Sequence, residues 1–526
     1  MHSENKHSEY YSLTIPQILA HNAVAYGETK TAIREKAYGI WQKFTWMDYY
    51  RYVRNTAAGF ASLCLKRGQV VCLVVDNHAE WLFCEIAAHA LGATTLNLFT
   101  SSIADELSSS INRINCSIVV VQDQEQVDKM LEVKDNLRHI SKVVYLDPTG
   151  MTSYENESWL ISYANLLTEG EKFNAENASF FDEEMAKGRP EDISVMIQTS
   201  GTTGIPKLAM LSHRNITQMA RQWVEAEGIQ TEDNWISMSP PAWIVDQMWG
   251  MGVALLGGMT MNFPETPETV KDDFRDIGPS MLITASRFWE DLASSIRVKI
   301  SDSGWLKKKL FERGEFIGKI IVGKKTKKIK IPLYLNVLYK IMNLLVYRPL
   351  LDRIGCARFQ SAFTGGHPIS PDVILFFRAI GLNLKQCYGL TEAGGIFQVQ
   401  PDNEVKLETV GKPLSLTEVH IAADQEVLVR SEANFSGYYN DYQATQNSYE
   451  DGWLKTGDAG YSDADGHLLN IGRKEDIIRK QSGEAFSPDF IETRLKFSPY
   501  IKEAVIFGES RPFITAMINI DMGNVG

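Results

Sequence analysis

The sequence predicts an α/β protein with parallel-type sheets flanked by helices, a β-rich module and a small α+β domain at the end. Three observations predict this fold class. Short valine-rich runs alternate with helical patterns, most clearly over residues 70–146. From about residue 415 the pattern changes to short strands and turns. The chain has 526 residues, which is too long for one hydrophobic core, so we expect several domains.

The valine-rich runs are typical of buried strands. "VVCLVV" (70–75) is followed by the helical pattern "EWLFCEIAAHALGA", which Gly92 can end. "CSIVVV" (116–121) is followed by the helical pattern "EQVDKMLEVKDNL" and then by "KVVYL" (142–146). Strand, helix and strand in this order predict βαβ units and a largely parallel sheet.

The later part of the chain has a different texture. "EVHIAADQEVLVRS" (418–431) and "DADGHLLNIG" (463–472) are typical of antiparallel strands joined by tight turns. We therefore expect an N-terminal core over residues 1–414, a β-rich subdomain over 415–472, and a hinge with the start of a small C-terminal domain over 473–526.

Charge and cysteine usage narrow the class of protein. The net charge of −12 argues against a nucleic-acid partner, because phosphate-backbone affinity comes from clustered lysine and arginine. The six cysteines show no metal-ligand spacing and are expected to be buried thiols. The polar N-terminus "MHSENKHSEYYS" has no apolar signal core, so a cytoplasmic location is expected.

One short stretch has the chemistry of a phosphate-binding loop. "QTSGTTGIPKLAM" (198–210) combines glycines, hydroxyl groups and Lys207, which can donate to or neutralise phosphate oxygens. It does not match G-x-x-x-x-G-K-[ST], and "KLAMLSH" after it is typical of a strand. We expect a strand–loop–strand device; a hairpin turn without ligand is the alternative.

Four motifs together resemble one enzyme family. They are "TSGTTGIPK" (199–207), "YGLTE" (388–392), "GWLKTGD" (452–458) and "GRKEDII" (472–478). Their order and spacing resemble those of the adenylate-forming superfamily, which includes acyl-CoA synthetases, luciferases and peptide-synthetase adenylation domains. The resemblance covers nearly the whole chain and is greatest to bacterial long-chain fatty acyl-CoA synthetases.

The resemblance implies a two-step ligase reaction that uses ATP, Mg²⁺ and coenzyme A. A carboxylate oxygen attacks the α-phosphate of ATP, pyrophosphate leaves, and the CoA thiol then displaces AMP from the acyl-adenylate. The expected acid is a medium- or long-chain fatty acid. An aryl or amino acid remains open, as does a module that binds ATP or acyl-adenylate with little turnover.

The resemblance also assigns residues to the phosphates and the metal. Thr391 is expected at the α-phosphate, and Glu392 is expected to coordinate Mg²⁺, a hard cation that suits a carboxylate; a surface carboxylate is the alternative for Glu392. The β- and γ-phosphates are assigned to Thr199, Ser200, Gly201, Thr202, Thr203, Gly204 and Lys207.

Further residues are assigned to the nucleoside. Tyr388 is expected to stack on adenine, with a core tyrosine as its alternative, and Gly389 lies beside it. Asp458 is expected to bind the ribose hydroxyls, with a turn aspartate as its alternative, and Arg473 to reach the ribose. The other side of the adenine slot is assigned to Gly365, Gly366, His367 and Pro368, with His367 either bonded to the base or facing outward.

The remaining predictions concern the acyl group, the hinge and the membrane. Trp243 is expected to line the mouth of the acyl pocket, or else to be a core tryptophan. Glu475 occupies the hinge position.

Residues 305–353 combine lysine clusters with an apolar pattern and are expected either to touch an anionic inner membrane face or to pack on their own domain. The chain ends at "MINIDMGNVG", before the family's late lysine is reached, which suggests a truncated C-terminal domain; the oligomeric state is left open.

Overall fold

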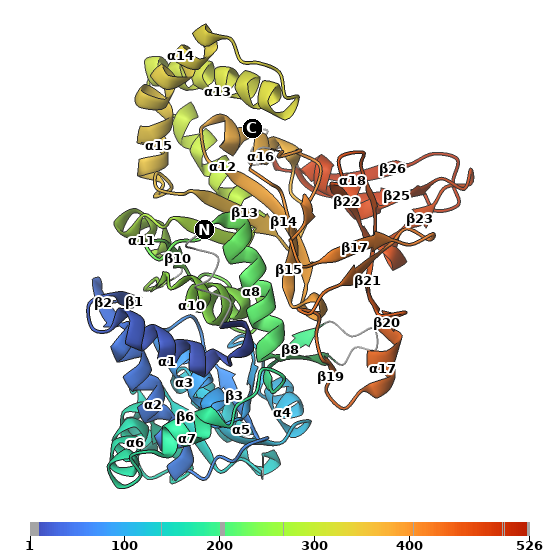
Figure 1. Cartoon of the computed structure of the whole chain (residues 1–526). Helices are drawn as coiled ribbons and strands as arrows, with labels where there is room; N and C mark the ends of the chain where they lie inside the picture. Colours follow the sequence, from blue (N-terminus) through green and yellow to red (C-terminus); the bar gives the residue numbers. More distant parts are fainter. Residues whose placement is uncertain are drawn as a thin grey trace. The chain divides into compact units, whose positions relative to one another are not determined.

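The computed structural model describes residues 10–137, 139–199, 206–266, 268–402, 404–496, 498 and 500–522. The chain divides into two compact units, and Figure 1 shows its elements. Unit 1 comprises Met1–Val270, Thr391–Gly395 and Glu432–Asn447. Unit 2 comprises Lys271–Leu390, Ile396–Ser431 and Ser448–Gly526. Two short segments from late in the sequence therefore belong to unit 1.

The larger sheet of unit 1 has eight strands in the order β19-β9-β8-β4-β3-β5-β6-β7. The neighbours from β8 through β7 pair in parallel, which confirms the predicted βαβ units. β9 pairs antiparallel with β8, and β19 with β9. The strands are β3 (Val70–Val74), β4 (Thr94–Asn97), β5 (Cys116–Val121), β6 (Lys142–Tyr145), β7 (Leu160–Ser162), β8 (Ile193–Thr199), β9 (Lys207–Ser212) and β19 (Gly437–Tyr438).

These strands are apolar throughout because their side chains point alternately to the two faces of the sheet and both faces are covered by helices. Val70, Cys72 and Val74 of β3 belong to one core cluster, shared with α4 (Ala104–Asn112) and α5 (Gln124–Glu132). The intervening residues of β3 are buried as well, and α3 (Ala79–Ala90) packs against this strand. A strand buried on both faces needs an unbroken apolar run.

The helix expected over residues 125–137 is shorter than its pattern suggested. α5 ends at Glu132, because Val133 takes φ −105° and ψ 10°, outside the helical region. A 3₁₀ turn, Lys134–Asn136, follows. Val133 and Leu137 are buried in the core cluster, so their apolar character serves packing rather than continuation of the helix.

Unit 1 also contains four further strands and the remaining helices. Helix α8 begins at His213, because Ser212 caps it by accepting a hydrogen bond from the Asn215 backbone N–H at 3.2 Å. The strands are β1 (Thr31–Ala37), β2 (Ile40–Thr45), β10 (Asn234–Ile236) and β11 (Thr260–Phe263), and the helices are α1 (Ile15–Tyr26), α2 (Trp46–Ser62), α6 (Tyr163–Glu176), α7 (Phe180–Ala186), α8 (His213–Glu227), α9 (Ile244–Asp246), a π-helix η4 (Gln247–Val253), α10 (Ala254–Gly257) and α17 (Tyr442–Asn447).

Unit 2 begins with a sheet in the order β16-β15-β14-β13-β12, in which β12, β13 and β14 are parallel. The strands are β12 (Met281–Ala285), β13 (Ser361–Gly365), β14 (Leu384–Leu390), β15 (Gly395–Val399) and β16 (Lys412–Pro413). Its helices are α11 (Val270–Ile277), α12 (Ser286–Ser301), α13 (Trp305–Thr326), α14 (Leu333–Met342), a π-helix η5 (Asn343–Tyr347), α15 (Arg348–Arg353), α16 (Pro371–Ala379) and α18 (Pro488–Lys496).

The turn-rich texture after residue 415 corresponds to antiparallel strands in unit 2. β17, β18, β21 and β20 form a sheet in that order, and β22 pairs with β21. Two further pairs are β23 with β24 and β25 with β26. The bounds are β17 (Glu418–Ile421), β18 (Glu426–Arg430), β20 (Tyr449–Glu450), β21 (Trp453–Ser462), β22 (Leu468–Arg473), β23 (Ile478–Arg479), β24 (Ala485–Phe486), β25 (Ile501–Phe507) and β26 (Thr515–Ile520).

The six cysteines are all free, and five of them are buried as expected. Cys64 is the exception: it is exposed and takes a φ of 65° in the turn that follows α2. An apolar neighbourhood in sequence does not fix burial in a turn. Across the residues that the structure describes, no helix is both long and apolar enough to cross a membrane.

Candidate active site

The structure confirms the two strands predicted on either side of the candidate phosphate loop. β8 and β9 pair antiparallel, and the last pair in the register is Thr199 with Lys207. The loop residues Ser200, Gly201, Thr202, Thr203 and Gly204 lie outside the described residues. The Thr199 hydroxyl oxygen is buried and has no hydrogen-bond partner among the described residues. Donor groups therefore stand on both strands where the loop begins and ends.

One aromatic residue, Tyr438, contacts both Lys207 and the predicted metal ligand, Glu392. The Lys207 ammonium is 4.9 Å from the centre of the Tyr438 ring. The Tyr438 hydroxyl donates a hydrogen bond to Glu392 Oε1 at 2.7 Å. Glu392 is half-buried in the 3₁₀ turn η6 (Thr391–Ala393), and all three residues belong to unit 1. Unit 1 thus brings the predicted phosphate ligand and the predicted metal ligand together.

Sequence reasoning did not select Tyr438. The residue lies in "GYYND" (437–441), within the turn-rich stretch that begins at about residue 415. Its strand β19 pairs with β9, and Tyr438 is opposite Ala209 in the register. The sequence signal that could have identified it is the pair of tyrosines after Gly437, which is typical of a short strand. The strand that pairs with it, however, lies more than two hundred residues earlier in the sequence.

A second cluster, within unit 2, gathers three residues predicted to contact the nucleoside. Asp458 in β21 pairs with Arg473 in β22. The Tyr388 hydroxyl donates to Asp458 Oδ2 at 2.6 Å, and Arg473 Nε lies 3.4 Å from Asp458 Oδ1. The Asp458 backbone N–H donates to the Thr456 hydroxyl at 3.1 Å. Three motifs that are far apart in sequence therefore meet at one carboxylate.

Burial of this cluster keeps the Tyr388 hydroxyl protonated beside the Asp458 carboxylate. Asp458 and Tyr388 are both buried, whereas the Arg473 side chain is exposed. Desolvation raises the pKa of Tyr388 well above its usual value, and the negative charge of Asp458 raises it further. Tyr388 therefore stays a hydrogen-bond donor. A carboxylate has about four lone-pair directions, so a carboxylate can accept several hydrogen bonds at once; here Asp458 accepts from Tyr388 and also has Arg473 as a partner.

The segment assigned to the adenine slot follows the carboxyl end of β13, next to the end of β14. Ligands of parallel α/β sheets commonly bind at such ends. Gly365 lies so close to Cys387 that a Cβ on it would be 2.9 Å from the cysteine sulfur. Gly366 takes a φ of 82°, and His367 and Pro368 are exposed. Gly389 lies within β14.

Trp243 is not a core residue. Its side chain is 43% exposed, at the N-terminal cap of α9, which excludes the alternative of a plain core tryptophan. The segment that carries it is held by Asp246, whose carboxylate accepts from the Ser239 backbone at 3.2 Å and from Asn77 at 2.8 Å. Desolvation raises the pKa of Asp246 to about 7. Glu475 is exposed in the 3₁₀ turn Lys474–Asp476 of unit 2.

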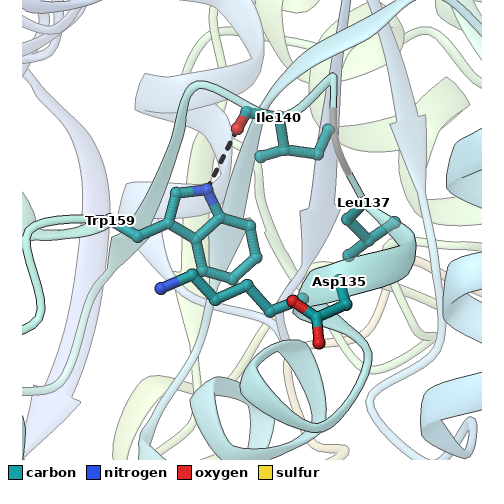
Figure 2. A pocket seen from close by; sticks show the side chains of 5 residues that line it. Asp135, Leu137, Ile140 and Trp159 are labelled. Atoms are coloured by element: carbon teal, nitrogen blue, oxygen red, sulfur yellow. Dashed lines mark hydrogen bonds between the residues drawn. The ribbon is translucent and has the colours of Figure 1, made fainter.

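A separate hollow of about 410 Å³ lies in unit 1 around Trp159 (Figure 2). It is lined by Lys134, Asp135, Leu137, Ile140 and Trp159. The Trp159 indole N–H donates to the Ile140 carbonyl at 3.0 Å. These residues directly precede β6 and β7, whereas Thr199 ends β8 in the same parallel sheet. The hollow is thus at the opposite end of the strands and contains none of the predicted site residues.

The chain belongs to the AMP-binding enzyme family. The family model matches residues 19–439, and a model of the AMP-binding enzyme C-terminal domain matches residues 475–524. The two models together include every residue that the four motifs assigned except Asp458 and Arg473, which lie between them.

Curated relatives of this chain include long-chain-fatty-acid–CoA ligases. ACSBG2 of Xenopus laevis is 26% identical over 524 residues, covering 97% of this chain and 69% of the relative. FadD15 of Mycobacterium bovis is 26% identical over 485 residues, covering 92% and 78%.

Solved structures share the fold. An anthranilate CoA ligase, AuaEII, in complex with anthranoyl-AMP has a TM-score of 0.73 at 17% identity, covering 97% of this chain and 87% of that one. A fatty acyl CoA synthetase of Mycobacterium tuberculosis has a TM-score of 0.65 at 17% identity, covering 98% and 89%. At this identity the likeness concerns the fold alone.

Proposed function

We propose that this protein is an AMP-forming ligase that joins a long-chain fatty acid to coenzyme A at the expense of ATP. The observation that carries the proposal is the buried Asp458 carboxylate, held between Tyr388 and Arg473, because it has the form of a ribose site. Family membership supports the adenylation chemistry, and the curated relatives support the fatty acid.

In the first step a fatty-acid carboxylate oxygen attacks the α-phosphorus of ATP, and the bond to pyrophosphate breaks. In the second step the CoA thiolate attacks the acyl carbonyl, and AMP leaves. Lys207, Thr199 and the loop 200–204 are proposed to hold the phosphates, with Thr391 at the α-phosphate. Gly365, Gly366, His367 and Pro368 are proposed to border the adenine opposite Tyr388 and Gly389, and Glu475 to serve as the hinge.

Glu392 is the proposed ligand of Mg²⁺. One of its oxygens accepts a hydrogen bond from Tyr438, and within the described part of the chain it forms no ion pair with a lysine or arginine. A carboxylate in that state suits a hard cation that also takes phosphate and water oxygens, and such a cation supplies charge neutralisation of the phosphates when bound.

The fold by itself does not select the acid that is activated. An anthranilate CoA ligase has the same fold, so the fold does not choose between fatty and aryl acids. Trp243 is proposed to lie at the acyl entrance, since a large exposed aromatic ring can contact an alkyl chain.

The acid is identified by ATP–pyrophosphate exchange with a panel of fatty, aryl and amino acids. We expect exchange to be greatest with long-chain fatty acids and weak with benzoate-type acids and amino acids. Exchange that is greatest with an aryl or amino acid would contradict the proposed substrate. ATP binding without exchange for any acid would favour a nucleotide-binding module.

We further propose that residues 305–353 touch an anionic membrane surface. The outward side of α14 and η5 is apolar instead of polar: Leu333 is 79% exposed and Leu344 is 69% exposed. The inward side is formed by Leu335 and Tyr347, which are buried. In Figure 1 these helices are drawn in yellow beside α13. The other exposed apolar side chains are Tyr334, Val337, Leu338, Ile341 and Leu345.

The charge around this face matches an anionic lipid surface. Residues 316–351 contain eight lysines and arginines and no aspartate or glutamate, in a chain whose net charge is −12. A basic segment beside an exposed apolar helix face is the arrangement by which proteins lie on membranes, with about 1 kcal/mol gained per basic residue near the surface. Long-chain fatty acids partition into such membranes, so the location suits the proposed substrate.

Vesicle cosedimentation tests this face. We expect the protein to bind vesicles of phosphatidylcholine with phosphatidylglycerol more than phosphatidylcholine alone, and less in high salt. Leu333→Gln with Leu344→Gln, and separately Lys325→Gln with Lys327→Gln, should weaken binding. Val24→Gln, at a residue that is also exposed but lies in α1, should not. Equal binding by all variants would contradict the proposal, and so would a dimer that the leucine substitutions dissociate.

A further inference from the structure

Tyr438 lies between two oppositely charged side chains that the proposed function assigns to ATP and Mg²⁺. Its ring faces the Lys207 ammonium at 4.9 Å, and its hydroxyl donates to Glu392 at 2.7 Å. No ion pair between Lys207 and Glu392 occurs in the ranges that the structure describes. A lysine and a glutamate so close to one ring would attract each other strongly in a half-buried site. Instead, each of the two groups contacts Tyr438.

The position of Tyr438 is fixed on both edges of its short strand. Its backbone N–H donates to the Thr445 hydroxyl at 2.8 Å. The next residue, Tyr439, donates its backbone N–H to the Leu208 carbonyl at 2.9 Å, next to Lys207. The Phe435 ring packs edge-on against the Tyr438 ring, with 4.8 Å between centroids. A side chain held in this way has little freedom to leave the space between the two charges.

Glu392 is tied to the same segment a second time. The Phe435 backbone N–H donates to the Glu392 carbonyl at 2.8 Å. Gly394, two residues after Glu392, takes a φ of 76°, and a Cβ there would be 2.2 Å from the Ala433 carbonyl oxygen. Only glycine permits this close approach. Residues 391–395 therefore lie directly against 432–438, and the Glu392 carboxylate is held relative to Tyr438.

We propose that Tyr438 is a positioning residue for the nucleotide and metal ligands, an inference that rests on the proposed function. Its ring prevents Lys207 from pairing with Glu392, so the ammonium remains free for phosphate oxygens. Its hydroxyl donates a hydrogen bond to Glu392 Oε1, and this bond orients the carboxylate so that Oε2 can bind a cation. The residue makes no contact with substrate in this role; it sets the separation and direction of the two groups that do.

Two substitutions separate these tasks. Tyr438→Phe keeps the ring and removes the hydroxyl, so ATP binding in EDTA should stay within about twofold of wild type. The Mg²⁺ concentration that half-saturates ATP–pyrophosphate exchange should rise by about threefold to tenfold, the effect of losing one hydrogen bond of typical net strength. Tyr438→Leu removes the spacer as well, so ATP binding measured by calorimetry in EDTA should also weaken.

A double substitution tests the spacer directly. If Lys207 pairs with Glu392 in Tyr438→Leu, then Tyr438→Leu with Glu392→Ala should bind ATP in EDTA more tightly than Tyr438→Leu alone. Tyr442→Phe is the matched control, since Tyr442 is exposed on α17 and should change none of these values. Melting temperatures show whether each variant is folded.

The inference is overturned if Tyr438→Phe, with an unchanged melting temperature, has a wild-type Mg²⁺ requirement and Tyr438→Leu binds ATP as wild type does. Glu392→Ala distinguishes this from failure of the proposed function. If Glu392→Ala changes the Mg²⁺ requirement and Tyr438→Phe does not, only the role of Tyr438 is wrong. If Glu392→Ala also leaves that requirement unchanged, the proposed metal site is wrong as well.

Discussion

Lys207→Met should lower ATP–pyrophosphate exchange by about 100-fold to 1,000-fold, the effect typical of losing one preorganised donor at a site of developing charge. Lys207 ends the loop at the start of β9, and its ammonium is directed by the Tyr438 ring instead of an acidic partner. Stability should change little, because methionine can still pack on the ring. The measurement is initial-rate exchange at saturating fatty acid, with the melting temperature as a check on folding.

Lys172→Met is the matched control for that substitution. Lys172 lies on α6 of the same unit and forms an exposed ion pair with Glu169 at 2.8 Å, so its loss changes the net charge equally without touching the candidate site. Exchange by Lys172→Met should match wild type. If Lys207→Met exchanged pyrophosphate at nearly the wild-type rate, Lys207 would not be a phosphate ligand.

Asp458→Asn should weaken AMP binding by about tenfold to a hundredfold. Hydrogen bonds to a charged group each contribute about 1.5–3 kcal/mol, and the substitution removes the charge that would receive the ribose hydroxyls. Asparagine preserves the size of this buried side chain, so the Tyr388 ring keeps its packing against Phe397 at 5.0 Å. Calorimetry of AMP binding measures the change.

A nucleotide that lacks both ribose hydroxyls makes the test specific. Wild type should bind dideoxy-AMP more weakly than AMP by the same factor that Asp458→Asn loses, and the variant should barely distinguish the two. Asp451→Asn serves as control, because Asp451 is exposed in a turn with a φ of 49°, which asparagine adopts readily. A variant that still preferred AMP as strongly as wild type would show that Asp458 does not contact the ribose.

Several parts of the fold could be predicted from short stretches. Strands β3, β5 and β6 and the β8–β9 hairpin at the phosphate loop followed from runs of five to seven residues, because valine content and glycine placement are local properties. The short strand β4 was not predicted. The exact start of α8 is not a local property, since it depends on which hydroxyl accepts a backbone N–H, and here Ser212 does.

Other features depend on contacts that no local pattern encodes. One such feature is that the apolar face of α14 points outward. An amphipathic pattern shows that the two faces of a helix differ, but it does not show which face the rest of the domain covers. The exposure of Trp243 is another: the indole is as apolar as the core tryptophans, and the buried Asp246 network decides where its segment lies.

The sequence by itself determined the family, the fold class and which charged residues belong to the candidate site, because each motif presents its functional groups within a few consecutive residues. Only the tertiary structure decided how those groups are arranged. Tyr438 reaches Lys207 through the β19–β9 pairing, and Asp458 of β21 meets Tyr388 of β14 through a side-chain hydrogen bond. Such contacts join segments tens to hundreds of residues apart, and their free energy comes from burial and hydrogen bonding that exist only once the chain is folded.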